Sequence, residues 1–305
     1  MVERGHMERK LVKEIGALAK ELSQTIAVAE SATGGMISSL LTDISGSSDY
    51  FRGGVVAYHN DVKVCVLGVD DETLSSYGAV SSETAAEMAV GVRSVVGADI
   101  GVSDTGIAGP TGATPGKPVG LFYVGLAVID GARTEQHQFD GNRLQNRSGA
   151  AQAVLTMLRD YLLEIKASIR EEKHVVTCFL EHQGKICLLR RSLSVGTYKG
   201  AWAGVSGYLE PGNKPLEQAM IEMWEEVHLG ADDVELVKEG EPLAAVDKQL
   251  GMKWIVHPFQ FRVKEQDKIN IDWEHSELRW VDPKDIGMYP TVPRLLEAWQ
   301  RVSIV

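Results

Sequence analysis

The feature that most constrains the fold is a change of pattern near residue 167. Before it, short apolar runs with strand character alternate with segments whose apolar residues recur at helical spacing. Such alternation predicts a layered α/β domain. Residues 167–173, ASIREEK, are polar and charged, and strand-like runs with one strong helix follow. Because 305 residues also exceed the usual size of one hydrophobic core, we expect two domains.

The expected elements divide at this boundary. In the first part, helices are predicted at 8–22, 34–41, 82–96 and 144–166, and strands at 25–29, 54–58, 100–103, 119–128 and 136–139. In the second part, strands are predicted at 174–181, 186–190, 254–263 and 278–281, and helices at 216–227 and 292–302. The predicted organisation is therefore a domain over 7–166, a linker over 167–173 and a domain over 174–305.

Charge and cysteine content limit the expected partners and location. The net charge of −11 argues against a nucleic acid or an anionic membrane as the main partner, although it leaves an anionic small ligand open. Cys65, Cys178 and Cys187 show no paired spacing, which suits a reducing cytosol, so a cytoplasmic location is expected. The start MVERGHMERK has no apolar core and is not expected to be a signal peptide.

A serine and a lysine stand near the ends of two predicted neighbouring strands. Ser31 precedes the turn 33–35 at a helix start, where unpaired backbone N–H groups would stabilise an oxyanion. Lys63 could take the serine proton if its pKa fell from ~10.4 towards roughly 7–8, with Tyr58 contributing a hydroxyl. The alternative is that Ser31 only caps the helix and Lys63 is a solvated surface lysine.

A glycine-rich loop and two arginines accompany this pair. The loop 105–112 follows a predicted strand, and its glycines would let a ligand approach the backbone closely. Arg143 and Arg147 lie one helical turn apart and could clamp a phosphate. The alternatives are a surface loop and a solvated helix face.

The motifs AESATGG, GVVAYHNDVK, GAVS and TGIAGPTG, in this order, resemble the CinA C-terminal family of nicotinamide-mononucleotide deamidases over about 7–165. The resemblance implies an α/β/α layered domain that hydrolyses the carboxamide to nicotinate mononucleotide and ammonia without a cofactor. It also implies that Ser31 is the nucleophile, Lys63 its base and Tyr58 a helper. The residues expected to bind substrate are Glu30, Thr33, Gly34, Gly35, Thr105, Gly106, Gly109, Arg143 and Arg147.

A second group of candidate residues lies in the predicted helix 216–227. Glu222, Glu225 and Glu226 are spaced i, i+3 and i+4, so they project from one helix face. Like charges at this spacing repel unless a divalent cation lies between them, and carboxylate ligands suit Mg²⁺ or Mn²⁺. The alternative is a solvated acidic face.

The second domain resembles Nudix hydrolases, which implies an α/β/α sandwich with a mixed sheet. Their box reads G-x5-E-x7-R-E-U-x-E-E-x-G-U, and Gly207 aligns with its first glycine, so the three glutamates match the metal-binding positions. Asn213, Ile221 and His228 depart from the box. Because the family's arginine orients the catalytic glutamate, Ile221 predicts a low rate. Glu274 or Glu277 could supply a further acid or base.

Two classes of function follow from these resemblances. In the first, a homo-oligomeric pyridine-nucleotide enzyme splits ADP-ribose or NADH in its second domain and deamidates a mononucleotide in its first. In the alternative, the Nudix-like half senses a nucleotide with weak or no hydrolysis. A protein whose main activity is Nudix pyrophosphatase, and a pair of inactive scaffolds, are further alternatives.

Overall fold

The computed structural model describes residues 2–303, with side chains from residue 9 onward. It divides between Ala167 and Ser168 into two compact units, here called unit 1 and unit 2. Helix α6 (Arg143–Ser168) ends unit 1, and strand β6 begins at Glu171. The predicted linker 167–173 is therefore shorter, because residues 171–173 pair with strand β12 despite their charge.

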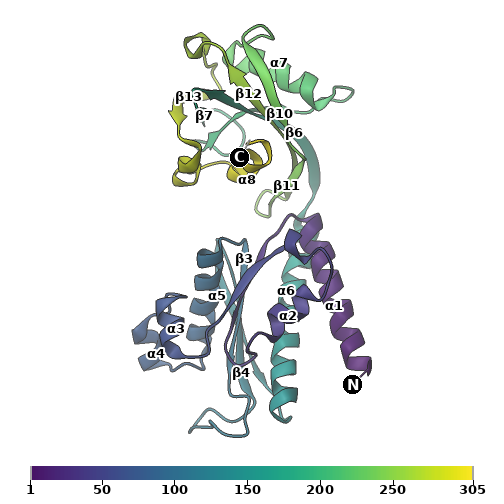
Figure 1. Cartoon of the computed structure of the whole chain (residues 1–305), viewed down its shortest axis with the longest axis vertical. Coiled ribbons are helices and arrows are strands. Elements are labelled where there is room, and N and C mark those ends of the chain that lie inside the picture. Colours follow the sequence, from purple (N-terminus) through teal and green to yellow (C-terminus); the bar gives the residue numbers. More distant parts are fainter. Residues whose placement is uncertain (1, 304–305) are drawn as a thin grey trace. The chain divides into compact units, whose positions relative to one another are not determined.

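Unit 1 is built on a five-stranded mixed sheet. The strand order is β2-β1-β3-β4-β5, with β1 (Ile26–Glu30) parallel to both neighbours and the later pairs antiparallel. The other strands are β2 (Phe51–Val56), β3 (Ile100–Gly106), β4 (Leu121–Val128) and β5 (Gly131–Gln138). Figure 1 shows α5 (Ser82–Val96) on one face of the sheet and α1 (Val2–Glu21) and α6 on the other.

Local sequence signals explain the central elements of unit 1. All five residues of β1 are buried, as expected for a parallel strand that helices cover on both faces. Helix α5 spans the predicted 82–96: the Ser81 side chain accepts a hydrogen bond from Thr84 N, and Gly97 ends the helix at φ 70°. A Cβ on Gly101 would lie 2.1 Å from Ala89 O, so glycine allows β3 to approach α5 closely.

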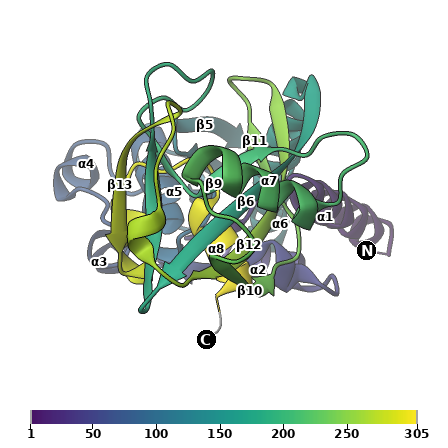
Figure 2. The same cartoon turned by 90° about the horizontal axis from the view of Figure 1, so that it is seen from above.

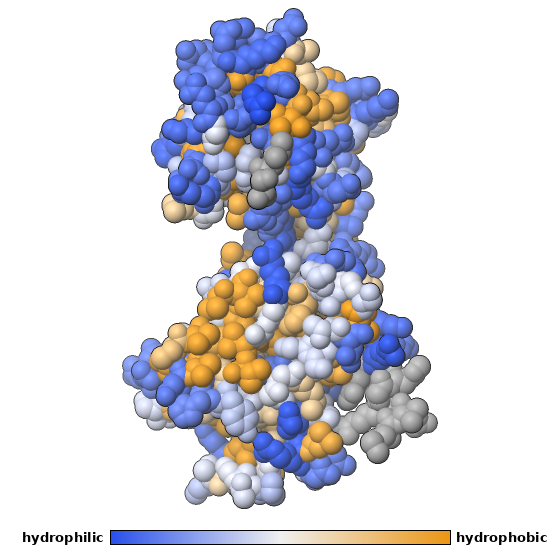
Figure 3. All heavy atoms as spheres, viewed as in Figure 1, coloured by the Kyte–Doolittle hydropathy of each residue, from blue (hydrophilic) through white to orange (hydrophobic). Residues whose placement is uncertain are grey.

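The remaining helices of unit 1 are short. They are α2 (Met36–Thr42), α3 (Asn60–Cys65), α4 (Asp71–Ser76) and the 3₁₀ turn Ser47–Asp49. Helices α3 and α4 were not predicted, because six residues are too few to show a helical period. Figure 3 shows exposed hydrophobic residues on one face of unit 1. Among the exposed apolar side chains of this unit, Val56 of β2 and Val90 and Val95 of α5 are 44–58% exposed.

Unit 2 holds an eight-stranded mixed sheet. Its main order is β10-β12-β6-β7-β13, with β11 on β12, β8 on β7 and β9 on β6. The long strands β6 (Glu171–His182) and β12 (Met252–Val263) are parallel. The others are β7 (Lys185–Arg191), β8 (Trp202–Ala203), β9 (Val205–Tyr208), β10 (Val234–Glu239), β11 (Leu243–Asp247) and β13 (His275–Val281).

Two helices cover opposite faces of this sheet. The core under α7 (Pro215–Val227) contains Cys178 and Leu180 of β6, whereas the core under α8 (Leu295–Val302) contains Phe179. This alternation is the period of two that places successive strand residues on opposite faces. Figure 2 shows α7 beside β9 and β6. The 3₁₀ turns are Gln266–Lys268 and Pro283–Met288.

The predicted fold class of two α/β domains, the second with a Nudix-like mixed sheet, is confirmed. Strands β8 to β11 were missed, because they are short or lie in Gly-rich and polar sequence. Within residues 2–303, no helix combines the length and the apolar character needed to cross a membrane.

Candidate functional site

Ser31 and Lys63 meet at one edge of the unit 1 sheet. Strands β1 and β2 run parallel with Glu30 opposite Val56, so the residues after both strands emerge at the same edge. Lys63 Nζ lies 3.1 Å from Ser31 Oγ and 2.7 Å from Ala57 O. Lys63 is 1% exposed, so it is not a solvated surface lysine. Burial lowers the pKa of Lys63, while the charge of Asp104 acts in the opposite direction.

Lys63 lies on helix α3. Its start is capped by the His59 side chain, which accepts a hydrogen bond from Asp61 N. Val62 on α3 and Leu67 just after it pack on the core beneath α5. These contacts hold the helix against the unit, so Lys63 points inward from a helix rather than from the polar loop expected after the second strand.

Glu30 does not face a substrate, which corrects its assignment to the substrate-binding set. Its carboxylate is fully buried and accepts five hydrogen bonds at 2.7–3.0 Å, from Thr33 Oγ1, Gly35 N, Ile37 N, Ser38 N and Ser38 Oγ. The first-turn N–H groups of a helix need acceptors, and the helix dipole favours a negative charge there. Glu30 therefore occupies donors that the sequence suggested for an oxyanion.

Asp104 is a site residue that the sequence analysis missed. It lies in β3, directly after the residues that pair with β1, and is fully buried. It accepts hydrogen bonds from Ser31 N at 3.1 Å and Thr33 N at 3.2 Å. The Thr33 hydroxyl also contacts it. Burial raises the pKa of Asp104 to about 6, against the hydrogen bonds of Thr33 and Ser31. A single acidic residue in a buried strand next to a glycine-rich loop was the available signal.

The two arginines of α6 tie the serine turn to the glycine-rich loop. Arg143 donates to Gly109 O at 2.8 Å and to Tyr58 Oη at 3.0 Å, and Arg147 donates to Thr33 O. Tyr58 is 64% exposed, and its described hydrogen bond goes to Arg143 rather than to Lys63. The helper role of Tyr58 stays a prediction.

Several expected substrate-binding residues shape the backbone instead. Thr105 is buried and donates to Ala79 O at 2.6 Å, and a Cβ on Gly106 would lie 2.2 Å from the Phe122 ring. Gly34, Gly35 and Gly109 have φ of 59°, 94° and 82°, which favour glycine in these turns. Close packing thus accounts for Thr105 and Gly106 without a ligand.

In unit 2, the three glutamates of α7 lie in different environments. Glu222 and Glu226 line a cavity of about 270 Å³, whereas Glu225 is exposed. Burial raises the pKa of Glu222, and burial together with the charge of Glu222 raises the pKa of Glu226 well above its usual range. The solvated-face alternative therefore applies to Glu225 only.

The three glutamates are not gathered into a metal site. Within the described part of the chain, no group of three His, Cys, Asp or Glu side chains has metal-binding geometry. Glu226 Oε2 instead accepts from Ser206 N at 3.3 Å. The donor set nevertheless fits a hard divalent cation, because Glu274 lines the same cavity and its charge raises the pKa of Glu226.

Gln218 orients Glu222, a role that the sequence assigned to the arginine missing at Ile221. Gln218 is 3% exposed and donates to Glu222 Oε1 at 2.7 Å. Its Oε1 accepts from Asn213 Nδ2 at 2.8 Å and from Glu210 N at 3.3 Å, and these donors set the orientation of the amide. Ile221 is 40% exposed. No motif in the sequence pointed to Gln218.

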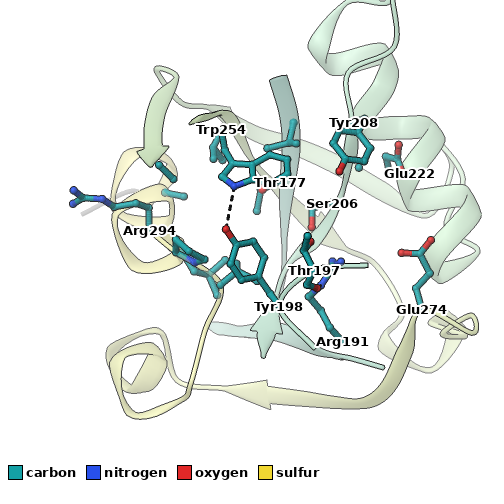
Figure 4. A pocket seen from close by; sticks show the side chains of 18 of the residues that line it. Thr177, Arg191, Thr197, Tyr198, Ser206, Tyr208, Glu222, Trp254, Glu274 and Arg294 are labelled. Carbon is teal, nitrogen blue, oxygen red and sulfur yellow. Dashed lines mark hydrogen bonds between the residues drawn. The ribbon is translucent and has the colours of Figure 1, made fainter. Parts of the chain in front are cut away.

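The cavity has an acidic side and an aromatic side. Figure 4 shows Glu222 and Glu274 on one side and Trp254 and Tyr198 on the other, with Trp254 Nε1 donating to Tyr198 Oη at 3.0 Å. Glu277 does not line the cavity; it pairs with Arg279 at 2.6 Å and Arg190 at 3.5 Å. Of the two further acid–base candidates, Glu274 lines the cavity and Glu277 does not.

Comparison with known proteins assigns both units. Residues 8–162 match the CinA C-terminal domain model, and residues 171–302 match the NUDIX domain model. A protein of Halothermothrix orenii described as competence-damage inducible is 55% identical over 159 residues, which are 52% of this chain and 38% of that protein. A CinA-like protein of Chlorobium limicola is 47% identical over 165 residues, 52% of this chain and 38% of that protein.

A solved structure adds to the match of unit 1. The competence damage-inducible protein A (ComA) of Klebsiella pneumoniae is 28% identical, with a TM-score of 0.50, and the match covers 51% of this chain and 97% of that one. The chain spans less than two fifths of the length of the two curated relatives above. The chain belongs to the CinA C-terminal domain family, and a NUDIX domain follows that domain in the same chain.

Proposed function

We propose that unit 1 hydrolyses the carboxamide of nicotinamide mononucleotide to nicotinate mononucleotide and ammonia. The observation that carries the proposal is the buried Lys63 Nζ, 3.1 Å from Ser31 Oγ. A serine beside a lysine of lowered pKa is an activated nucleophile. Membership of the CinA family supports the choice of substrate.

The proposed reaction proceeds in two steps. Neutral Lys63 donates one N–H to Ala57 O, and its lone pair accepts the proton of Ser31 as Oγ bonds to the carboxamide carbon. The carbon–nitrogen bond then breaks, the proton returns to the leaving nitrogen, and ammonia departs. Water, activated by the same lysine, hydrolyses the resulting serine ester to the carboxylate. We assign phosphate binding to Arg143, whose guanidinium is oriented by its hydrogen bonds to Gly109 O and Tyr58 Oη.

The test is ammonia release from nicotinamide mononucleotide, with Ser31→Ala as the blank. Nicotinamide riboside, which lacks the phosphate, serves as the matched substrate. Release from the mononucleotide that exceeds release from the riboside supports the proposal. Equal release from native protein and Ser31→Ala contradicts it.

For unit 2 we propose hydrolysis of a nucleoside diphosphate derivative such as ADP-ribose or NADH. The supporting observation is that Gln218 holds Glu222 at the cavity despite the departure at Ile221. Mg²⁺ or Mn²⁺ held by Glu222, Glu226 and Glu274 would supply charge neutralisation for the phosphates. A mononucleotide released there would be of the class that unit 1 consumes.

The competing hypothesis is a sensor that binds nucleotide without cleaving it. All six tryptophans of the chain lie in unit 2, and Trp254 lines the cavity, so tryptophan fluorescence reports ligand binding there. ADP-ribose and NADH are incubated with Mg²⁺, and mononucleotide products are quantified. Fluorescence change without products favours the sensor, and products that disappear in Glu222→Gln favour the hydrolase.

The expected homo-oligomer stays a prediction. Val90 and Val95 of α5 are exposed and offer apolar surface for self-association. Light scattering over a dilution series measures the mass, and a monomer at all concentrations contradicts it.

A further inference from the structure

Asp104 has no role in the reaction proposed above. It nevertheless accepts hydrogen bonds from the chain on both sides of Ala32, the residue after Ser31. Its Oδ1 accepts from Ser31 N and its Oδ2 from Thr33 N. Both hydrogen bonds connect the turn after β1 to strand β3, just beyond the last paired residues of these parallel strands, Ala29 and Ser103. One carboxylate thereby fixes the backbone of the turn that carries Ser31.

Thr33 links Asp104 to a second buried carboxyl. Thr33 Oγ1 lies 2.8 Å from Glu30 Oε2 and also contacts Asp104 Oδ1. A hydroxyl has a single proton to donate, so both contacts are hydrogen bonds only when one of the carboxyls is protonated. The geometry therefore includes a place for an exchangeable proton next to the serine turn.

The surroundings identify Asp104 as the group that exchanges this proton. Apart from the Thr33 hydroxyl, Glu30 has four donors, whereas Asp104 has two. Asp104 is also fully buried, and its pKa is raised to about 6, first by burial and also by the charge of Glu30. The charged groups around the turn come from β1 (Glu30), α3 (Lys63) and α6 (Arg147, which donates to Thr33 O). Among these, Lys63 responds to the charge of Asp104.

We propose that Asp104 is a positioning residue that fixes the Ser31–Thr33 turn and whose negative charge sets the pH above which Lys63 can accept the serine proton. The proposal rests on the Ser31/Lys63 mechanism proposed above. An anionic Asp104 stabilises the charged form of Lys63, and burial of Lys63 opposes this. Removing the charge should therefore make Lys63 neutral at a lower pH.

The test compares Asp104→Asn with Asp99→Asn. Asp99 is a matched control, because its Oδ2 accepts from Thr25 N at 2.7 Å and Thr25 Oγ1 at 2.6 Å at the other end of the same two strands. Labelling of Ser31 by phenylmethanesulfonyl fluoride is followed by intact mass against pH, with Ser31→Ala as the blank. The pH dependence of ammonia release is measured in parallel.

In Asp104→Asn, the acid limb of both profiles should move to lower pH by about one unit, because the counter-charge is gone. The maximum rate should fall roughly tenfold or more, since in asparagine an NH2 group replaces one of the two oxygens that accept from Ser31 N and Thr33 N. Asp99→Asn should leave the acid limb unchanged. Far-UV circular dichroism confirms that each variant is folded.

The outcomes separate this proposal from the one it rests on. If Ser31 is labelled but nicotinamide mononucleotide is not hydrolysed, the substrate proposal fails and the labelling profile still decides the role of Asp104. A lower maximum rate with an unmoved acid limb shows that Asp104 is merely structural. Absence of Ser31 labelling at every pH, an unfolded Asp104→Asn, or an equal shift in Asp99→Asn overturns the proposal.

Discussion

Both units bury a glutamate beside their candidate site, but they satisfy it differently. Glu30 in unit 1 has five protein donors within 3.0 Å. Glu226 in unit 2 is 4% exposed and accepts from Ser206 N at 3.3 Å, with His275 Nε2 3.7 Å away and three further glutamates on the same cavity. A buried charge is costly unless it is paired.

In unit 1 the buried glutamate is satisfied by protein donors, whereas in unit 2 the buried glutamate shares its cavity with three further glutamates and with Arg191 and Arg294. In unit 1 the helix start, the serine turn and the lysine are held by contacts among the protein's own residues. In unit 2 we propose a divalent cation as the ligand that neutralises the carboxylates of the cavity. The predictions below test this contrast, from the largest expected effect to the smallest.

Lys63→Arg and Ser31→Ala should each reduce ammonia release by at least roughly 1000-fold. Arginine keeps a positive charge but cannot act as a base in a protein. Lys166→Arg is the matched control, because Lys166 is half-exposed and pairs with Glu21 at 2.8 Å. Ammonia is assayed with nicotinamide mononucleotide. An active Lys63→Arg enzyme would show that the lysine acts by its charge alone.

Removal of divalent metal should affect the activities of the two units differently. Chelation by EDTA should lower nucleoside diphosphate hydrolysis by about 100-fold or more, because the glutamates of the cavity then repel one another and the substrate phosphates. Ammonia release should be unaffected. Both products are measured in one sample, and Mg²⁺ is added back. Ammonia release that is lost on chelation and restored by Zn²⁺ contradicts the serine–lysine mechanism.

Gln218→Leu should lower hydrolysis in unit 2 by roughly tenfold to 100-fold, because Glu222 loses the donor that orients it. Gln249→Leu is the control, since Gln249 is exposed in a turn. Product formation from ADP-ribose is measured with Mg²⁺, and tryptophan fluorescence checks binding. Unchanged rates in Gln218→Leu would show that Gln218 does not set the orientation on which the rate depends.

Ile221→Arg should raise the same rate by only a fewfold. An arginine there would restore the side chain expected in the Nudix box, but Gln218 already holds Glu222. Asn213 is kept, because a glutamate in its place could not donate to Gln218 Oε1. A gain of roughly 100-fold would mean that Gln218 positions Glu222 poorly.

The local patterns predicted much of what was found. Alternating strand and helix signals predicted the first α/β unit, and the change of pattern near residue 167 predicted a second one. The segment predicted as a helix over 82–96 is α5 with the bounds observed. The i, i+3 and i+4 spacing correctly placed Glu222 and Glu226 near each other, since helical periodicity is local. The motif order around Ser31 and Lys63 pointed to the pair that the sheet brings together.

The tertiary structure decided which side chains contact the candidate site residues. Strand β1 lies between β2 and β3, which brings Lys63 and Asp104 to Ser31 from segments 32 and 73 positions away in the chain. The start of α2 lies at the end of β1, so Glu30 accepts from the N–H groups of that helix. In unit 2, the pairing of β13 with β7 places Glu277 beside Arg190. By itself, the sequence determined periodicity, turns and motif order, because these depend on neighbours along the chain. Burial and hydrogen-bond partners depend on strand order and on helix packing, which local patterns do not encode.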